Sequence, residues 1–160
     1  MLKITLVEFI FRAVPEAFIH IFAMCVFVGV KIGKKDYIKT SILLSMMMFI
    51  IRALPISYGI HTILIIMGMI ALSITLNKLS IIDTIRAAII NVVVQFLAEG
   101  INLLFIQVVL KREIEVVIAE PVSKTLYGMP SLLIWIMFIF IYYKFMGKTR
   151  KYHGEYREDM

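Results

Sequence analysis

Five apolar runs of 15 to 26 residues, separated by polar connections, constrain this chain more than any other feature. The runs cover residues 5–30, 37–51, 61–76, 87–110 and 131–145. A hydrocarbon core of about 30 Å needs roughly 20 residues of α-helix, and a chain in lipid must satisfy its own backbone hydrogen bonds. The sequence therefore predicts an all-α fold, a polytopic transmembrane bundle of about five spans. The second and third runs are short, so whether each crosses fully stays open.

The composition supports a membrane protein rather than a soluble domain. With 61% hydrophobic and 18% charged residues, the chain has too little polar surface to cover a water-soluble core. We expect one transmembrane domain over residues 1–147 and a short charged cytoplasmic tail over 148–160, in a multi-pass protein of the cell membrane. The lipid bilayer is then the first partner. The single cysteine, Cys25, excludes a disulfide within the chain.

Positive charge is concentrated in the short connections, which indicates topology rather than nucleic-acid binding. Of the 17 Lys and Arg residues, 11 fall on one side if the N-terminus is outside and the C-terminus inside. That side holds Lys31, Lys34, Lys35, Lys39, Lys78, Arg86, Lys144, Lys148, Arg150, Lys151 and Arg157. The other side holds Lys3, Arg12, Arg52, Lys111, Arg112 and Lys124. The positive-inside rule therefore favours an outer N-terminus, and we expect no nucleic acid as a partner.

Prolines and polar segments set the expected boundaries. Pro15 marks either a kink or the beginning of the first clean helix. Residues 79–86 form a short amphipathic piece or the start of the fourth span. Residues 111–128 form the longest connection, which contains apolar residues suited to the membrane interface, and Pro121 and Pro130 bound its later part. The fifth span then begins at Ser131.

A polar stripe runs along the first span. Glu8, Arg12, Glu16 and His20 recur every four residues, so they share one helix face. The spacings of Glu8 to Arg12 and of Arg12 to Glu16 each suit an ion pair within the helix. Charged groups in hydrocarbon are costly, by roughly 2.5–3.5 kcal/mol each on insertion scales, and are usually paired or face water or protein.

A second polar stripe lies on the fourth span and matches the first. It consists of Asn91, Gln95, Glu99 and Asn102, which fall on one face of a helix. Glu99 has no basic residue within four positions along the chain, so its partner must come from another segment. Arg12 and Arg52 are the best candidates, because both belong to the same outer half of the expected topology.

Two interpretations of these stripes stay open. One is a polar cavity that opens outwards between the first and fourth spans, capped by the turn from Arg52 to His61, and binds a peptide, a small polar molecule or a proton. The other is a buried ion-pair network that only fixes helix packing. The candidate ligand-binding or network residues are Glu8, Arg12, Glu16, His20, Arg52, His61, Asn91, Gln95, Glu99 and Asn102.

The sequence offers no clear enzyme, metal or cofactor signature. His20 and Cys25 are five residues apart and point to different helix faces, so with His61 they do not make a zinc site. Glu8 and Arg12 match only part of the motif of membrane-embedded glutamate proteases, and position 7 is Val where a paired glutamate is needed. We therefore expect no catalytic residue, no bound metal and no cofactor.

The stretch from Arg52 through Pro55 and Gly59 to His61, between two apolar runs, resembles a pattern in sensor histidine kinases. The similar proteins are Gram-positive kinases of the GHKL type, with a multi-span N-terminal input domain. The Arg12–Glu16, Glu99–Asn102 and Glu120–Pro121 pairs fit the same pattern. The resemblance implies a bacterial input domain that senses a peptide, lipid or envelope cue. No phosphoacceptor helix or ATP-binding domain follows the fifth span, so a free-standing domain, a fragment and an accessory protein all fit.

These observations lead to three hypotheses. The first is a non-enzymatic sensor-like or regulatory membrane protein in signal transduction, with an outward-facing intramembrane polar site, which acts as a homo-oligomer or through a membrane or cytoplasmic signalling partner. The second is a small transporter component, a substrate-binding subunit whose polar stripes hold the substrate. The third is an intramembrane peptide-processing enzyme, which would require an essential residue among Glu8, Glu16, His20, Cys25 and His61.

Overall fold

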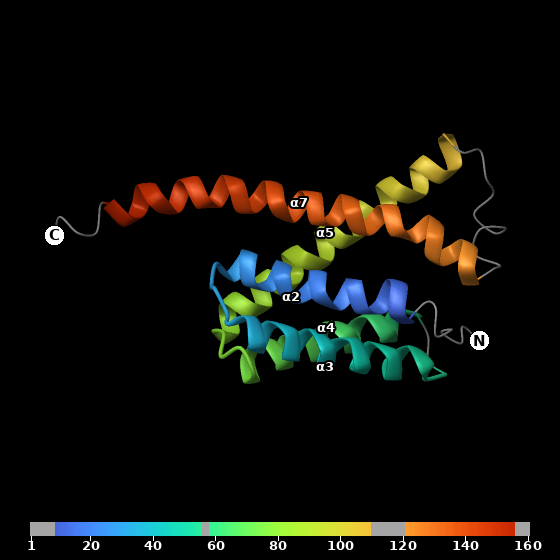
Figure 1. Cartoon of the computed structure of the whole chain (residues 1–160), viewed down its shortest axis with the longest axis horizontal. Helices are drawn as coiled ribbons and strands as arrows, with labels where there is room; N and C mark the ends of the chain where they lie inside the picture. Colours follow the sequence, from blue (N-terminus) through green and yellow to red (C-terminus); the bar gives the residue numbers. More distant parts are fainter. Residues whose placement is uncertain (1–8, 56–57, 110–120, 156–160) are drawn as a thin grey trace.

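All the regular structure is helical in the part of the chain that the computed structural model describes, residues 9–55, 58–109 and 121–155 (Figure 1). A π-helical turn, η1 (Phe9–Ala13), precedes five α-helices. These are α2 (Val14–Val28), α3 (Lys34–Ala53), α4 (Tyr58–Thr75), α5 (Ile81–Val108) and α7 (Pro121–Glu155). The predicted all-α class is therefore confirmed.

Three helical segments are long and apolar enough to cross a membrane. They are Phe9–Val28, Ile81–Val108 and Leu126–Phe145, and they coincide with the first, fourth and fifth predicted spans. The apolar part of α4, Gly59–Thr75, is shorter. Helix α3 carries charges in its first turns and at Arg52, near its end. The membrane character expected from the sequence therefore has a structural basis in three of the five helices.

The first helix begins where its proline predicts. The backbone is π-helical through Ala13 and α-helical from Val14, which places Pro15 in the first turn of α2. A proline is tolerated there, because the first N–H groups of a helix have no partner within the helix. The helix ends at Gly29, whose φ of 77° is the left-handed conformation that a residue without Cβ adopts most easily.

The fourth helix begins earlier than its clean apolar run. Ser80 is the N-cap, and its hydroxyl accepts a hydrogen bond from the backbone N–H of Asp83 at 3.5 Å. Thr84 adds a hydroxyl hydrogen bond to the Ser80 carbonyl at 2.6 Å. Of the two alternatives for residues 79–86, the structure therefore selects the start of the fourth span.

The expected boundary at Pro130 is wrong. Helix α7 begins at Pro121 and passes through Pro130, which lies inside it. Residues 121–128, expected to belong to a connection, are helical, and residues 110–120 lie outside the described part of the chain. Proline usually breaks a helix in water, but within a helix bundle neighbouring side chains can bond the backbone groups that it leaves unpaired. The same helix also runs across the expected domain boundary at 147 and ends at Glu155.

Helix α2 lies at the centre of the bundle, where it contacts α3, α4, α5 and α7. One apolar core joins α2 to α3, α4 and α5 around Ile21, Met24 and Leu44. A second joins α2 to α5 and α7 around Ala98 and Trp135. In Figure 1, the α2–α3 and α4–α5 connections lie at one end of the bundle, and the α3–α4 turn lies at the other. Successive helices therefore run in alternating directions.

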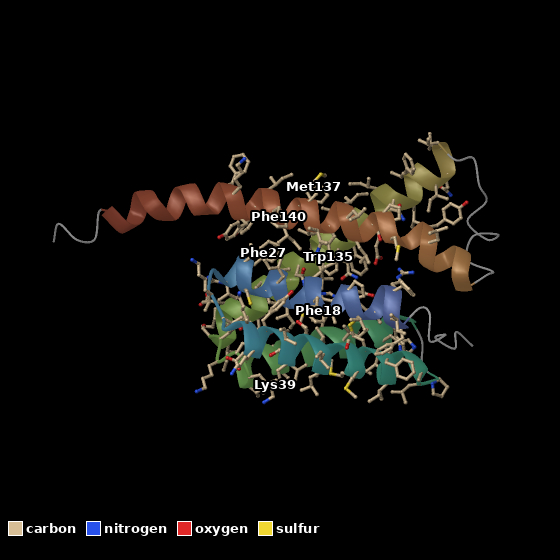
Figure 2. The ribbon with its side chains drawn as sticks, viewed as in Figure 1. Phe18, Phe27, Lys39, Trp135, Met137 and Phe140 are labelled. Atoms are coloured by element: carbon tan, nitrogen blue, oxygen red, sulfur yellow. The ribbon has the colours of Figure 1, made fainter. Side chains whose placement is uncertain are left out.

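The outer surface of the bundle is apolar. Figure 2 labels Trp135 together with Met137 and Phe140 on α7. Trp135 is buried, whereas Met137 and Phe140 are more than half exposed. Large exposed apolar side chains also line α5, from Ile82 to Val108. A surface of this kind is stable when it faces lipid rather than water.

Candidate functional site

The two predicted polar stripes face each other in the bundle. Glu16 on α2 is hydrogen-bonded by Gln95 on α5, and His20, one turn further along α2, is hydrogen-bonded to Asn91, one turn back along α5. Each step of four residues forward in α2 is thus matched by four residues backward in α5. This antiparallel register brings polar side chains from distant parts of the sequence into two neighbouring layers. We call them the charged group (Glu16, Arg52, Gln95 and Glu99) and the neutral group (His20, Met69, Asn91 and Trp135).

A buried ion pair between helices forms the centre of the charged group. Nη2 of Arg52, at the end of α3, donates to Oε1 and Oε2 of Glu16 at 2.8 and 2.9 Å. The Glu16 side chain is 5% exposed and that of Arg52 is 27% exposed. A carboxylate so deeply buried needs a compensating charge, and removal of its partner would leave that charge isolated. The pair therefore holds α2 to α3 and sets the position of Glu16.

Gln95 connects the ion pair to a second carboxylate. Its Nε2 donates to Oε1 of Glu16 and to Oε1 of Glu99, each at 3.3 Å. Both distances exceed the usual range for N–H···O bonds, so each contact is weak. Glu99 is half-buried and has no ion pair within 4.0 Å among the described residues. The expectation that Arg52 pairs with Glu99 is wrong, because the Arg52 guanidinium binds Glu16.

Arg12 lies in the next layer of the same register, opposite Glu99. It is close enough to Glu16 and Glu99 to interact with both electrostatically, but makes no ion pair within 4.0 Å with a described residue. Its guanidinium lies against α7, where a Cβ added to Gly128 would be 3.1 Å from Nη1 of Arg12. The expected Arg12–Glu16 pair within one helix is therefore absent. The change from π- to α-helical geometry between these residues alters the angular offset on which that expectation relied.

The neutral group lies one turn deeper in the bundle and contains no compensating charge. Asn91 Nδ2 is 2.8 Å from His20 Nδ1 and 3.6 Å from Sδ of Met69. An amide N–H₂ can only donate, so His20 Nδ1 accepts, and the proton of a neutral imidazole is on Nε2. The ring of Trp135 meets the His20 ring edge to face, with centroids 4.7 Å apart. Oδ1 of Asn91 and Nε1 of Trp135 are buried without a hydrogen-bond partner among the described residues.

Asn102, the last member of the stripe on α5, contacts the backbone of α7 rather than another site residue. Its Nδ2 donates to the carbonyl of Tyr127 at 2.8 Å, three residues before Pro130. Ser131 Oγ donates to the carbonyl of Gly128 at 2.6 Å. The carbonyl that Pro130 leaves without its helix donor is that of Leu126, four residues earlier, and neither bond reaches it. Asn102 thus joins α5 to the backbone of α7 just before Pro130.

The two remaining candidate residues are Glu8 and His61. Glu8 lies outside the described part of the chain. His61 is half-buried near the beginning of α4, at the same end of the bundle as Arg52. Among the described residues, no three His, Cys, Asp or Glu side chains lie close enough together to hold a metal ion.

A third polar face, on α3, was missed in the sequence. Thr40, Ser41 and Ser45 are all buried against the other helices, and the Thr40 hydroxyl donates to Oδ1 of Asn77 at 2.9 Å. Ser41, Ser45 and Arg52 are spaced by four and seven residues, so they share one side of the helix, among apolar neighbours. The same helical periodicity that picked out the other two stripes would have found this one.

Comparisons with known proteins do not add to these observations. No family model, no curated protein and no solved structure matches the chain. The resemblance to the input domains of sensor kinases therefore depends only on the residues that first indicated it. The function must be argued from the geometry of the charged and neutral groups.

Proposed function

We propose that this chain is a non-enzymatic, sensor-like or regulatory membrane protein, in which the charged group forms an intramembrane polar site and α7 contacts a partner. The observation that carries the proposal is the Arg52–Glu16 ion pair, linked through Gln95 to Glu99. It joins three helices within apolar surroundings. Ionisable groups at such positions are costly and typically belong to functional sites.

The accessibility of Glu99 favours a site over a purely structural network. Glu16 is buried and its charge is neutralised by Arg52, whereas Glu99 is half-buried and, within the described part of the chain, has one weak hydrogen bond, from Gln95. A network that served packing alone would have every carboxylate paired, because an unpaired charge in a membrane destabilises the bundle. Glu99 is thus the group best placed to receive a proton or a polar ligand.

Five membrane crossings are the simplest account of the alternating helices. At 1.5 Å per residue, α3 with 20 residues and α4 with 18 residues are about 30 and 27 Å long, close to the thickness of a hydrocarbon core. We propose that both cross together with α2, α5 and α7. Their positions in the bundle support this count, because both lie alongside α2 (Figure 1).

The distribution of exposed charge supports an outer N-terminus. The end of the bundle with the α2–α3 and α4–α5 connections carries Lys31, Lys34, Lys35, Lys39, Lys78 and Arg86, all exposed. At the other end, the described Arg12 and Arg52 are half-buried and face the polar site. Among the described residues, the exposed positive charge at these two ends of the bundle thus lies at the end proposed to face the cytoplasm. Reporter fusions at residues 32 and 78 should both give cytoplasmic signals.

Native mass spectrometry of the protein, released from its host membrane in mild detergent, tests the proposed function. A homodimer, or a complex with a signalling protein and no small ligand, is the expected result. A monomer that carries a defined small molecule, or a complex with a nucleotide-hydrolysing subunit, would instead identify a transporter component. Cleavage of a peptide that depends on His20 or Glu16 would identify a processing enzyme.

Charge-removing variants make the test specific to the site. Arg12→Gln and Glu99→Gln should reduce partner capture several-fold at unchanged protein level, because each alters the half-buried charge of the site. Arg86→Gln removes an exposed charge at the opposite end of α5 and serves as the matched control. If partner capture is the same for all three variants, the charged group is not the functional site.

A further inference from the structure

Two opposite charges face each other in the α2–α5 register without forming an ion pair. Arg12 is one turn before Glu16, and Glu99 is one turn after Gln95, so the register of the two hydrogen-bonded layers places them in the same layer. Yet the Arg12 guanidinium lies against Gly128 of α7, and among the described residues the Glu99 carboxylate accepts a hydrogen bond from Gln95 alone. Arg12 therefore lies against α7, although a carboxylate of opposite charge is near it on α5.

The part of α7 that Arg12 touches lies before a break in the helix ladder. Pro130 has no N–H, and kinks in helices typically occur at such residues. In Figure 1 the first turns of α7 bend away from the line of the rest of the helix. Residues 121–129 thus form a short arm that adjoins the remainder of α7 at a natural hinge.

The two sides of this hinge are held by different interactions. After the hinge, Trp135 and Ile139 are fully buried in the apolar core with Ala98. Before the hinge, Leu126 is 65% exposed, and the described contacts are the Asn102 bond to the Tyr127 carbonyl and the Arg12 contact at Gly128. Apolar packing holds the part of α7 around Trp135, whereas Asn102 and Arg12 make polar contacts with the arm at Tyr127 and Gly128. Local opening should therefore occur in the arm first.

We propose that residues 121–129 are a hinged arm whose position reports the state of the charged group, and that Arg12 is the positioning residue that couples them. When Arg12 lies against Gly128 the arm is held to the bundle. When Arg12 turns to pair with Glu99, the arm is released at Pro130. This inference deepens the proposed function, on which it rests, by naming how a change at Glu99 reaches α7.

Hydrogen–deuterium exchange, read by mass spectrometry on the full chain in lipid nanodiscs, tests the arm directly. Arg12→Gln should make the amides of residues 121–129 exchange about tenfold faster and leave residues 131–139 nearly unchanged, since exchange follows local opening. Glu99→Gln should slow exchange in the arm, because Arg12 loses its alternative partner. Pro130→Ala should slow it as well, because alanine restores the missing helix hydrogen bond.

One control variant and two contrary outcomes complete this test. Arg86→Gln, an exposed charge on the far end of α5, should change neither segment. If Arg12→Gln accelerates both segments alike, Arg12 stabilises the bundle as a whole and the arm is not separate. If Pro130→Ala leaves exchange in the arm unchanged, there is no hinge. Because this measurement needs neither ligand nor partner, it can contradict the proposal of a hinged arm while partner capture still supports the proposed function.

Discussion

The charged and neutral groups are built on the same two helices, one turn apart, yet they differ in charge and in exposure. In the charged group, a third helix supplies Arg52 to neutralise Glu16, and Glu99 stays half-buried. In the neutral group, His20, Asn91 and Trp135 are each no more than 3% exposed and bear no formal charge if His20 is neutral. The bundle therefore tolerates polar atoms in its middle and keeps ionised groups nearer its end.

This difference separates what each group contributes. A neutral buried hydrogen bond between membrane helices contributes about 0.6 kcal/mol on average and at most about 1.7 kcal/mol. A buried charge that loses its partner costs several times more. The neutral group should thus adjust the packing of α2 on α5, while the charged group should determine whether the end of the bundle that holds Arg52 assembles correctly.

The largest expected effect is the loss of Arg52. Arg52→Met should lower the free energy of unfolding by about 3–5 kcal/mol, because Glu16 is left buried without a compensating charge. Unfolding by SDS titration from mixed micelles measures this. The double variant Glu16→Gln with Arg52→Met should recover most of the loss, and Lys39→Met, at an exposed position on α3, is the control. A double variant no more stable than Arg52→Met would remove the distinction between the two groups.

The next effect concerns the neutral group. Asn91→Leu should cost about 1–3 kcal/mol, because His20 Nδ1 loses its donor while it stays buried. Replacement of both partners, as His20→Phe with Asn91→Leu, should lie closer to the wild type, since neither member of the hydrogen bond is then left unpaired and the edge contact to Trp135 is kept. Thermal unfolding in detergent compares the three proteins. Additive losses in the double variant would contradict the assignment of this group as a simple hydrogen-bonded pair.

The smallest effect is expected at Gln95, which adjoins both carboxylates. Gln95→Leu removes two contacts of 3.3 Å and should cost no more than about 0.6–1.7 kcal/mol. Gln107→Leu, the same change at an exposed position of α5, is the matched control. The SDS titration used for Arg52 serves here too. A loss as large as that of Arg52→Met would mean that Gln95, and not the ion pair, organises the charged group.

Much of the fold could be predicted because lipid imposes a simple rule on sequence. Apolar runs gave the position of every helix, and two polar stripes at helical spacing gave most of the residues that meet between α2 and α5. The stripes carry this information because, on each of the two helices, the polar residues recur at helical spacing and so lie on one face. Their one-turn register follows once the two helices are antiparallel neighbours.

The partners of individual side chains could not be predicted in the same way. Arg52 binds Glu16 rather than Glu99 because of the depth at which α3 ends, and depth depends on packing that no local pattern contains. Arg12 does not pair with Glu16 because five π-helical residues precede α2. The Tyr127 carbonyl of α7 is bonded by Asn102, on another helix. The first and third of these contacts join residues that are distant in sequence.

The length of α7 has a mechanical consequence. At 1.5 Å per residue, its 35 residues measure about 52 Å along the helix axis, whereas a hydrocarbon core measures about 30 Å, so a membrane-spanning α7 would extend about 20 Å beyond that core. A helix resists bending, because backbone hydrogen bonds link each turn to the next. A tilt of the buried segment at Trp135 would therefore also move Glu155, and the sideways displacement would grow with distance along the helix.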